Sequence, residues 1–233
     1  MGGRGQGRGG ISGPQRGIKD DNSEVTFSNR TVTATENVVK ALGEENLESM
    51  ADYINGAIER VTGLDDFLTL NIVDGASGNT YAWMDWNGTM GINGKLFKNV
   101  DKLSQTYVED VLAGFHPKGT DFNDVAVHEA GHFLDRKLTQ MLGNQLQDWE
   151  RASTPIVRTA LDNLKARGDN RTYEQMQADL SGYGAQFYRG HTGNSFVETY
   201  AEAIADFGKN QDRANPLSRE IVKLTREYLR KVQ

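Results

Sequence analysis

The chain has 233 residues, a formal net charge of −6 and no cysteine. The lack of cysteine excludes disulfides and thiolate metal sites, so histidine, carboxylate and tyrosine side chains remain as the strong ligands. Basic and acidic residues are mixed along the chain, and no apolar run approaches the roughly 20 residues of a membrane span. Neither nucleic acid nor a membrane is therefore an expected partner.

Residues 1–22 form a glycine-rich segment that carries Arg4, Arg8 and Arg16. This composition cannot bury enough apolar surface to order itself, which predicts a disordered tail or linker. An RNA-binding arm of the RGG type is the alternative, although it would lack aromatic neighbours. The segment has no signal peptide, because it lacks an apolar core, and this predicts a protein that is soluble where it is made. Residues 23–233 are expected to form one domain.

The next part of the chain predicts a strand, a helix and a small sheet. "EVTFSNRTVTAT" alternates weakly, as a strand does, and the apolar residues that follow have helical spacing with a break near Gly43. Residues 67–93 contain short segments rich in β-branched and aromatic residues, separated by "GASGN" and "NG" turn signals. They predict strands of a small antiparallel or mixed sheet.

From Leu103 onward the pattern is helical. Helices are predicted at about 103–113, 122–142, 146–167, 172–181, 195–208 and 216–231. A small sheet followed by a run of helices indicates an α+β fold.

Two of the four histidines of the chain lie in the segment "DVAVHEAGHFLD". On a helix, His128 and His132 at i and i+4 project from one face about 40° apart, which is close enough to hold one ion. Glu129 borders the same face, where a carboxylate suits a general base in peptide hydrolysis. Small residues at Ala130 and Gly131 allow another element to approach closely. The alternative is a pair of hydrogen-bonded core histidines on a buried helix.

A catalytic zinc site needs a third protein ligand besides the two histidines. The metzincin extension does not supply it, because Asp135 and Leu138 stand where that motif requires Gly and then His or Asp. Downstream, "NSFVETYAEAIADFGKN" predicts a helix on which Glu198, Glu202 and Asp206 form a line at i, i+4 and i+8. Buried carboxylates must be paired or bind a metal, whereas the alternative is a solvated stripe on an amphipathic helix.

The two segments together resemble the glutamate zincins, a class of HExxH metallopeptidases. "HEAGHFLD" followed by "SFVETYAEAIADF" is similar to the catalytic domain of anthrax lethal factor and to related zincin domains of bacterial toxins and bacteriophage head proteins. The resemblance implies a zincin-like α+β fold, with a small mixed β-sheet followed by a mostly helical half. It also implies His128, His132 and Glu198 as Zn²⁺ ligands, Glu129 as general base and Glu202 as the residue that orients a ligand histidine.

One position departs from the lethal-factor pattern, which places an oxyanion-stabilising tyrosine seven residues before the ligand glutamate. His191 occupies that position here. Three alternatives stay open: His191 donates the hydrogen bond to the tetrahedral intermediate, a shift of the loop brings Tyr188 into that place, or neither acts. Tyr183 lies close by in the same segment, "SGYGAQFYRGHTGNS".

Three further features have two interpretations each. His116, in the loop "GFHPKGTDFND", is either exposed or lines the site next to it. Asp135, one turn beyond His132, either orients a ligand or pairs with Arg136 or Lys137. The segment "GTMGINGKLF" is either the edge strand along which zincins bind an extended peptide or an ordinary hairpin strand.

The sequence therefore predicts a zinc-dependent endopeptidase that acts on protein or peptide substrates. The alternative is a phage virion or assembly protein that uses the domain structurally, with weak or lost proteolysis and with phage head or other assembly proteins as partners. A toxin effector would share the enzyme chemistry and differ only in delivery. These contexts correspond to a location in the virion, in the cytoplasm or in a target cell.

Overall fold

The structure is a computed structural model that describes residues 24–26, 32–65, 67–75, 78, 80–143, 146, 151–186 and 194–232. The tail predicted for residues 1–22 lies outside this part of the chain. The strands are β1 (Glu24–Thr26), β2 (Val32–Thr35), β3 (Leu70–Asp74), β4 (Ala82–Met84) and β5 (Thr89–Ile92). The helices are α1 (Glu36–Leu42), α2 (Glu44–Thr62), α3 (Gly94–Phe97), α4 (Val100–Leu112), α5 (Asp124–Leu142), α6 (Ser153–Ala166), α7 (Tyr173–Leu180), α8 (Gly182–Gln186), α9 (Asn194–Asn210) and α10 (Pro216–Val232).

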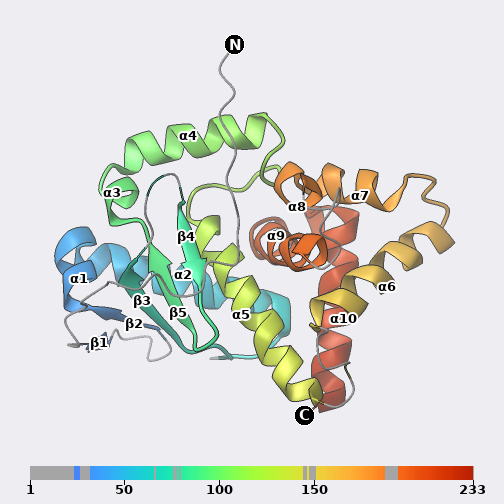
Figure 1. The fold of residues 1–233 in the computed structure, drawn as a ribbon, viewed down its shortest axis with the longest axis horizontal. Helices are drawn as coiled ribbons and strands as arrows, with labels where there is room; N and C mark the ends of the chain where they lie inside the picture. The colour runs from blue at the N-terminus through green and yellow to red at the C-terminus, as the bar shows by residue number, and fades with distance from the viewer. Residues whose placement is uncertain are drawn as a thin grey trace.

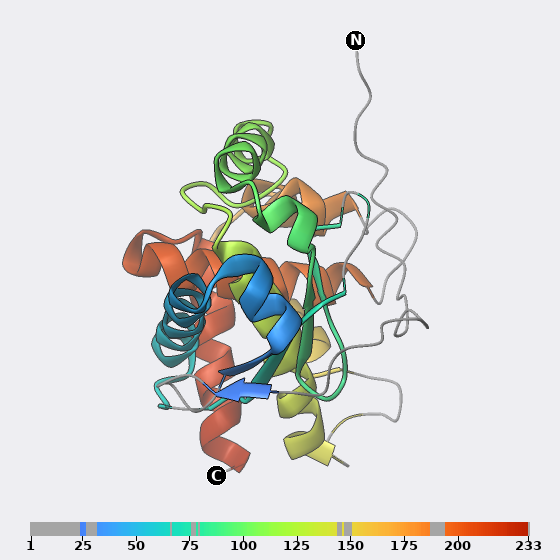
Figure 2. The same ribbon diagram turned by 90° about the vertical axis from the view of Figure 1, so that its left-hand side faces the viewer.

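The fold is mixed α+β, as predicted, with the strands in the order β1-β2-β3-β5-β4. The three central strands β2, β3 and β5 run parallel, whereas β1 and β4 are antiparallel to their neighbours. Figure 1 shows the sheet on one side of α5 and the helices α6, α9 and α10 on the other. Figure 2 shows α4 at the top of the molecule, beyond the end of the sheet. Helix α5 therefore lies between the sheet and the helical half.

The turn between β4 and β5 forms a hairpin, and the pairing of β5 with β3 leaves β4 at the edge of the sheet. The Asp85 carboxylate accepts the backbone N–H groups of Asn87 at 2.7 Å and Thr89 at 2.8 Å, and Gly88 has a φ of +88°. This turn folds β4 back onto β5, whose other side already pairs with β3. The interpretation of "GTMGINGKLF" as an edge strand is therefore wrong, because its strand β5 is internal and β4 is the edge.

Most helices begin and end within a turn of their predicted positions. The predicted break at Gly43 separates α1 from α2, with a φ of +86° that favours glycine. The helix predicted at 146–167 instead begins at Ser153, where the Asp135 carboxylate accepts the Ser153 N–H at 2.6 Å. That contact from α5 is tertiary, so helical periodicity gives no sign of it. The short helices α3 and α8 were not predicted.

One apolar core joins the sheet to the helices. Its largest fully buried side chains include Ile54 of α2, Ile72 of β3, Leu134 of α5 and Tyr200 of α9. Among the described residues, no helix is both long enough and apolar enough to cross a membrane.

Candidate metal centre

The two histidines of α5 and one glutamate of α9 converge on a single point. The rings of His128 and His132 lie edge to face with centroids 4.8 Å apart. The Oε2 atom of Glu198 lies 3.4 Å from the Nε2 atom of each histidine. One ligand atom from each of the three residues lies within 4.8 Å of the other two. The three residues that the sequence singled out are thus brought together.

Close packing of α5 against α9 makes this convergence possible. A Cβ atom added at Gly131 would lie 3.0 Å from the Cα atom of Ala201 and 3.2 Å from the Cβ atom of Ile204. A larger side chain at either contact point would hold the two helices apart. The expectation that small residues next to the histidines allow close approach is confirmed.

The donor atoms fit a small cation such as zinc. Two imidazole nitrogens and one carboxylate oxygen match the protein ligands of many catalytic zinc sites, which keep a further position open. In the described part of the chain, the buried Oε2 atom of Glu198 has no hydrogen-bond partner. A buried carboxylate oxygen without a donor is unfavourable unless a cation interacts with it. The three side chains therefore offer suitable donor atoms for a metal ion, and one of these atoms, Oε2 of Glu198, has no hydrogen-bond donor among the described residues.

The electrostatic field at this point is strongly negative. Burial lowers the pKa of His128, but the nearby carboxylates of Glu202 and Glu198 outweigh it, so the pKa lies well above its usual value. Burial also acts to raise the pKa of Glu198, yet His132 and His128 hold it well below its usual range. A group of acids that stabilises positive charge on an imidazole would also stabilise a bound cation.

Glu202 links His128 to a second layer of side chains. Its Oε1 atom lies 3.7 Å from Nδ1 of His128 and 3.4 Å from Nδ1 of His116. The ring of His116 stacks on Tyr107, with centroids 4.6 Å apart and planes 7° from parallel. The interpretation of His116 as an exposed loop histidine is therefore wrong, since its side chain is only 12% exposed. The sequence feature that indicated a place near the site is the loop with Pro and Gly directly before α5, in which His116 lies.

Glu129 occupies the position expected of a general base. It is buried beside the histidines, and burial raises its pKa, although the charges of His132 and His128 oppose this. Within the part of the chain that the structure describes, no hydrogen bond engages its carboxylate. A carboxylate with a raised pKa and a free oxygen can accept a proton near neutral pH.

Tyr183 of α8 is a residue whose importance the sequence did not reveal. The centroid of its ring lies 5.9 Å from that of the His128 ring. Its backbone N–H donates to the carbonyl of Phe115 at 3.0 Å. Burial raises the pKa of the Tyr183 hydroxyl, and the charges of Glu198, Glu129 and Glu202 raise it further. The phenol therefore keeps its proton and can donate it in a hydrogen bond. The sequence feature that could have indicated this position is a tyrosine in the segment shortly before α9.

The two residues predicted for the oxyanion role, His191 and Tyr188, lie outside the described residues. Their roles stay predictions.

Two other acids near the site have structural partners. Asp135 accepts both the N–H of Ser153 at 2.6 Å and its hydroxyl at 3.0 Å, with Arg151 at 3.8 Å. Its expected pairing with Arg136 or Lys137 is wrong, because those residues donate to the carbonyls of Asp85 and Phe67. Among the described residues, Asp135 also makes no hydrogen bond to His132.

The third acid in the line on α9, Asp206, is also hydrogen-bonded to other parts of the protein. It accepts hydrogen bonds from the backbone N–H of Asn215 at 2.8 Å and from the hydroxyl of Ser218 at 2.6 Å. Of the three acids, only Glu198 and Glu202 face the histidines.

Comparison with known proteins adds no assignment to this geometry, since no family model, no curated protein and no solved structure matches the chain.

Proposed function

We propose that the protein is a zinc-dependent endopeptidase with a zincin-like fold. The observation that carries the proposal is the convergence of His128, His132 and Glu198, with an unpartnered buried oxygen on Glu198. An HExxH helix next to a helix that bears the third ligand is the arrangement expected of a glutamate zincin. The buried acid Glu129 beside the triad supports a hydrolytic site in preference to a purely structural one.

Each residue around the triad has a distinct role in this proposal. Zinc, when bound, supplies Lewis-acid chemistry, because it polarises the scissile carbonyl and makes a water molecule more acidic. Glu129 takes the proton from the attacking water and delivers it to the leaving amine. The Glu202 carboxylate, with Oε1 3.7 Å from Nδ1 of His128, favours a proton on Nδ1 and so directs the Nε2 lone pair toward the ligand position.

Tyr183 is our candidate, among the described residues, for stabilising the oxyanion. Its protonated hydroxyl sits on a side chain that contacts the ring of His128. A neutral donor preorganised next to the reacting carbonyl stabilises the negative charge that develops there. His191 and Tyr188 remain alternatives from the sequence pattern.

The edge strand β4 offers a way to hold an extended substrate. In the described part of the chain it pairs only with β5, and α5 packs beside it. A peptide added to its free side would gain backbone hydrogen bonds and would run past the histidine helix.

Replacement of Glu129 tests the proposal. The zinc-loaded wild-type chain should cleave unstructured protein substrates such as casein, and Glu129→Gln should reduce the rate by about 100-fold or more, since general-base catalysis is typically worth that much. Zinc content should stay at one ion per chain in both proteins. Tyr183→Phe in the same assay should lower kcat more than it changes KM. Stoichiometric zinc without any cleavage by the wild type would reject the peptidase and favour the structural assembly role.

A further inference from the structure

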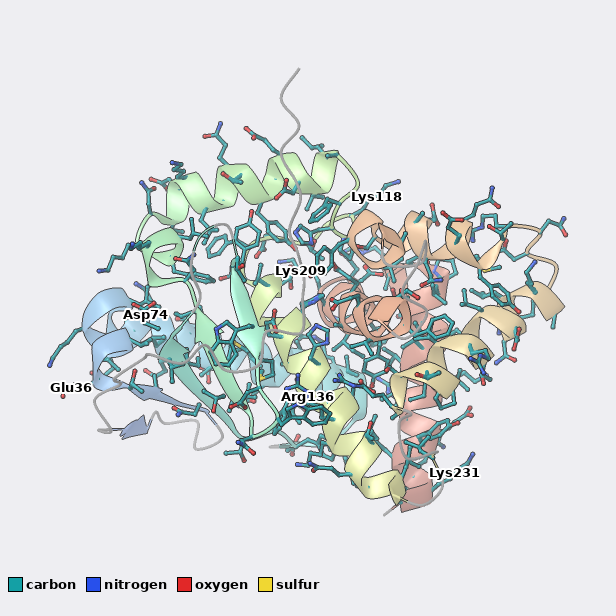
Figure 3. The ribbon with its side chains drawn as sticks, viewed as in Figure 1. Glu36, Asp74, Lys118, Arg136, Lys209 and Lys231 are labelled. Carbon is teal, nitrogen blue, oxygen red and sulfur yellow. The ribbon has the colours of Figure 1, made fainter. Side chains whose placement is uncertain are left out.

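A cluster of one tryptophan and two arginines lies one helical turn beyond the histidines. The guanidinium carbons of Arg136, on α5, and Arg151, directly before α6, each lie 4.8 Å from the ring centroid of Trp86. Trp86 belongs to the turn that ends the edge strand β4, and it is 54% exposed. Figure 3 shows Arg136 between α5 and the β4–β5 hairpin. We call Trp86, Arg136 and Arg151 the Trp–Arg cluster.

Arg136 belongs to the same row of α5 as the two histidines. Positions 128, 132 and 136 follow one another at i, i+4 and i+8, so Arg136 continues the line of His128 and His132 along the helix. The cluster is therefore adjacent to the site.

The two arginines have unused capacity to bind an anion. Arg136 donates from Nη1 to the carbonyl of Asp85, but its buried Nε has no hydrogen-bond partner among the described residues. Over the same part of the chain, no carboxylate lies within ion-pair distance of Arg136. Among the carboxylates of the described residues, Arg151 reaches only that of Asp135, at 3.8 Å, which already accepts two hydrogen bonds from Ser153.

The two cations also disfavour each other. Burial and then the charge of Arg151 lower the pKa of Arg136 from its usual value. A buried donor without an acceptor, next to a second positive charge, is relieved by one negatively charged group that reaches both.

We propose that the Trp–Arg cluster is a substrate subsite that binds the carboxylate side chain of a glutamate or aspartate in the peptide. The inference rests on the proposed peptidase function and specifies its substrate class. One turn of α5 rises about 5.4 Å, which is close to the roughly 6.8 Å between side chains on the same face of an extended peptide. The acidic residue therefore binds about two positions from the residue next to the metal, and the Trp86 ring packs against its methylene groups.

Paired peptides that differ only in charge test this subsite. A library of acetylated and amidated peptides would place Glu, or Gln as its neutral match, at each position on both sides of the cleaved bond. At one position, the wild-type kcat/KM should favour Glu over Gln by about tenfold or more, as expected for a hydrogen bond between charged groups. Arg136→Gln and Arg151→Gln should each bring this ratio close to one, and Arg136→Lys should retain part of it.

Matched controls separate the subsite from general charge effects. Arg219→Gln removes one exposed positive charge from α10, outside the cluster, and should leave the Glu/Gln ratio unchanged. A wild-type ratio near one at every position would overturn the inference, as would a ratio that survives both arginine replacements. A preference for peptides with a free C-terminus, without any effect of internal Glu, would also overturn it and assign the cluster to a terminal carboxylate.

A binding measurement keeps this inference separate from the proposed function. Calorimetry on the zinc-loaded Glu129→Gln chain compares the Kd of the same Glu and Gln peptides without cleavage. If the wild type cleaves no peptide but the Glu peptide binds about tenfold tighter through Arg136, the peptidase function fails and the subsite stands. If peptides are cleaved without charge preference, the function stands and the subsite fails.

Discussion

In the proposed zinc site, Glu202 controls the proton on His128. A neutral imidazole carries one proton, and the carboxylate beside Nδ1 of His128 keeps that proton on Nδ1, so the Nε2 lone pair is available to a metal. His116 contacts the same carboxylate oxygen and stacks on Tyr107. Burial acts to raise the pKa of Glu202, but the charge of His128 outweighs it and lowers the pKa to about 2. The carboxylate is therefore charged at neutral pH.

Replacement of Glu202 by Gln should weaken zinc binding by about 10- to 100-fold, the usual cost of losing a carboxylate that orients a ligand histidine. Competition with a chelator of known affinity measures the change. Glu220→Gln is the matched control, because Glu220 is also a buried glutamate but pairs with Arg167 at 2.7 Å. It should leave zinc affinity unchanged, and equal losses in both variants would contradict the role of Glu202.

At this scale, short-range spacing in the sequence was sufficient for the histidine pair but not for its surroundings. His128 and His132 are four residues apart on one helix, so helical geometry alone brings them together. His116 and Tyr183 meet because Gly182 and Tyr183 donate backbone hydrogen bonds to Gly114 and Phe115, a contact between the start of α8 and the loop after α4. No periodicity encodes such a contact.

The packing of α5 against α9 determines whether the third ligand reaches the histidines. Gly131 is the point of closest approach, where an added Cβ atom would lie 3.0 Å from backbone Ala201. Backbone atoms in a buried helix cannot move aside as the end of a flexible side chain can. The glycine is therefore a requirement of the helix pair and not of α5 alone.

Gly131→Ala should lower the free energy of unfolding by about 1–3 kcal/mol, the usual cost of overpacking a core, in spite of the better helix propensity of alanine. Denaturant unfolding measures it. Gly56→Ala in α2 is the matched control, since its Cβ atom would meet only the end of the Arg60 side chain at 3.3 Å. That variant should be neutral or up to about 1 kcal/mol more stable. A neutral Gly131→Ala would show that the two helices can separate.

The contact of α2 with α5 includes a buried carboxyl group. Asp124 accepts the hydroxyl of Tyr53 at 2.6 Å and the backbone N–H of Asp121 at 2.7 Å. Burial nevertheless raises the pKa of Asp124 from 3.8 to about 6. Because the folded carboxyl holds its proton to higher pH than the unfolded one, this group stabilises the fold below about pH 4. That contribution is lost as the pH rises through about 6.

The Asp124→Asn replacement removes this titrating group. The difference in stability between variant and wild type therefore reports on Asp124 and not on other acids. Between about pH 4 and pH 7, the free energy of unfolding of the variant relative to the wild type should rise by roughly 3 kcal/mol, from 1.36 kcal/mol per pKa unit. Denaturant titrations of both proteins across this range give the difference. A difference that is constant with pH, or that falls, would contradict a raised pKa at Asp124.

The sequence predicted most elements, but not the order of the strands. Turn signals such as Asn87–Gly88 predicted the hairpin of β4 and β5, but which of its two strands meets β3 depends on long-range pairing. The start of α6 was likewise misplaced, because Asp135 of a different helix satisfies its first N–H group. Tertiary contacts, and not local propensity, decided both.

For the whole molecule, the position of α5 between the sheet and the helical half explains why the site lies where it does. One side of α5 meets the edge strand β4, and another meets α9 with Glu198 (Figure 1). A substrate along β4 would thus be close to both the triad and the Trp–Arg cluster. The arrangement of elements, and not any one of them, brings two histidines and Glu198 together beside the buried acid Glu129.

The location of zinc in the folded protein tests the central claim most directly. Crystals of the zinc-loaded chain, measured at the zinc absorption edge, should give one anomalous peak about 2 Å from Nε2 of His128, Nε2 of His132 and a carboxylate oxygen of Glu198. Zinc bound elsewhere, or no bound zinc after loading and buffer exchange, would contradict the account.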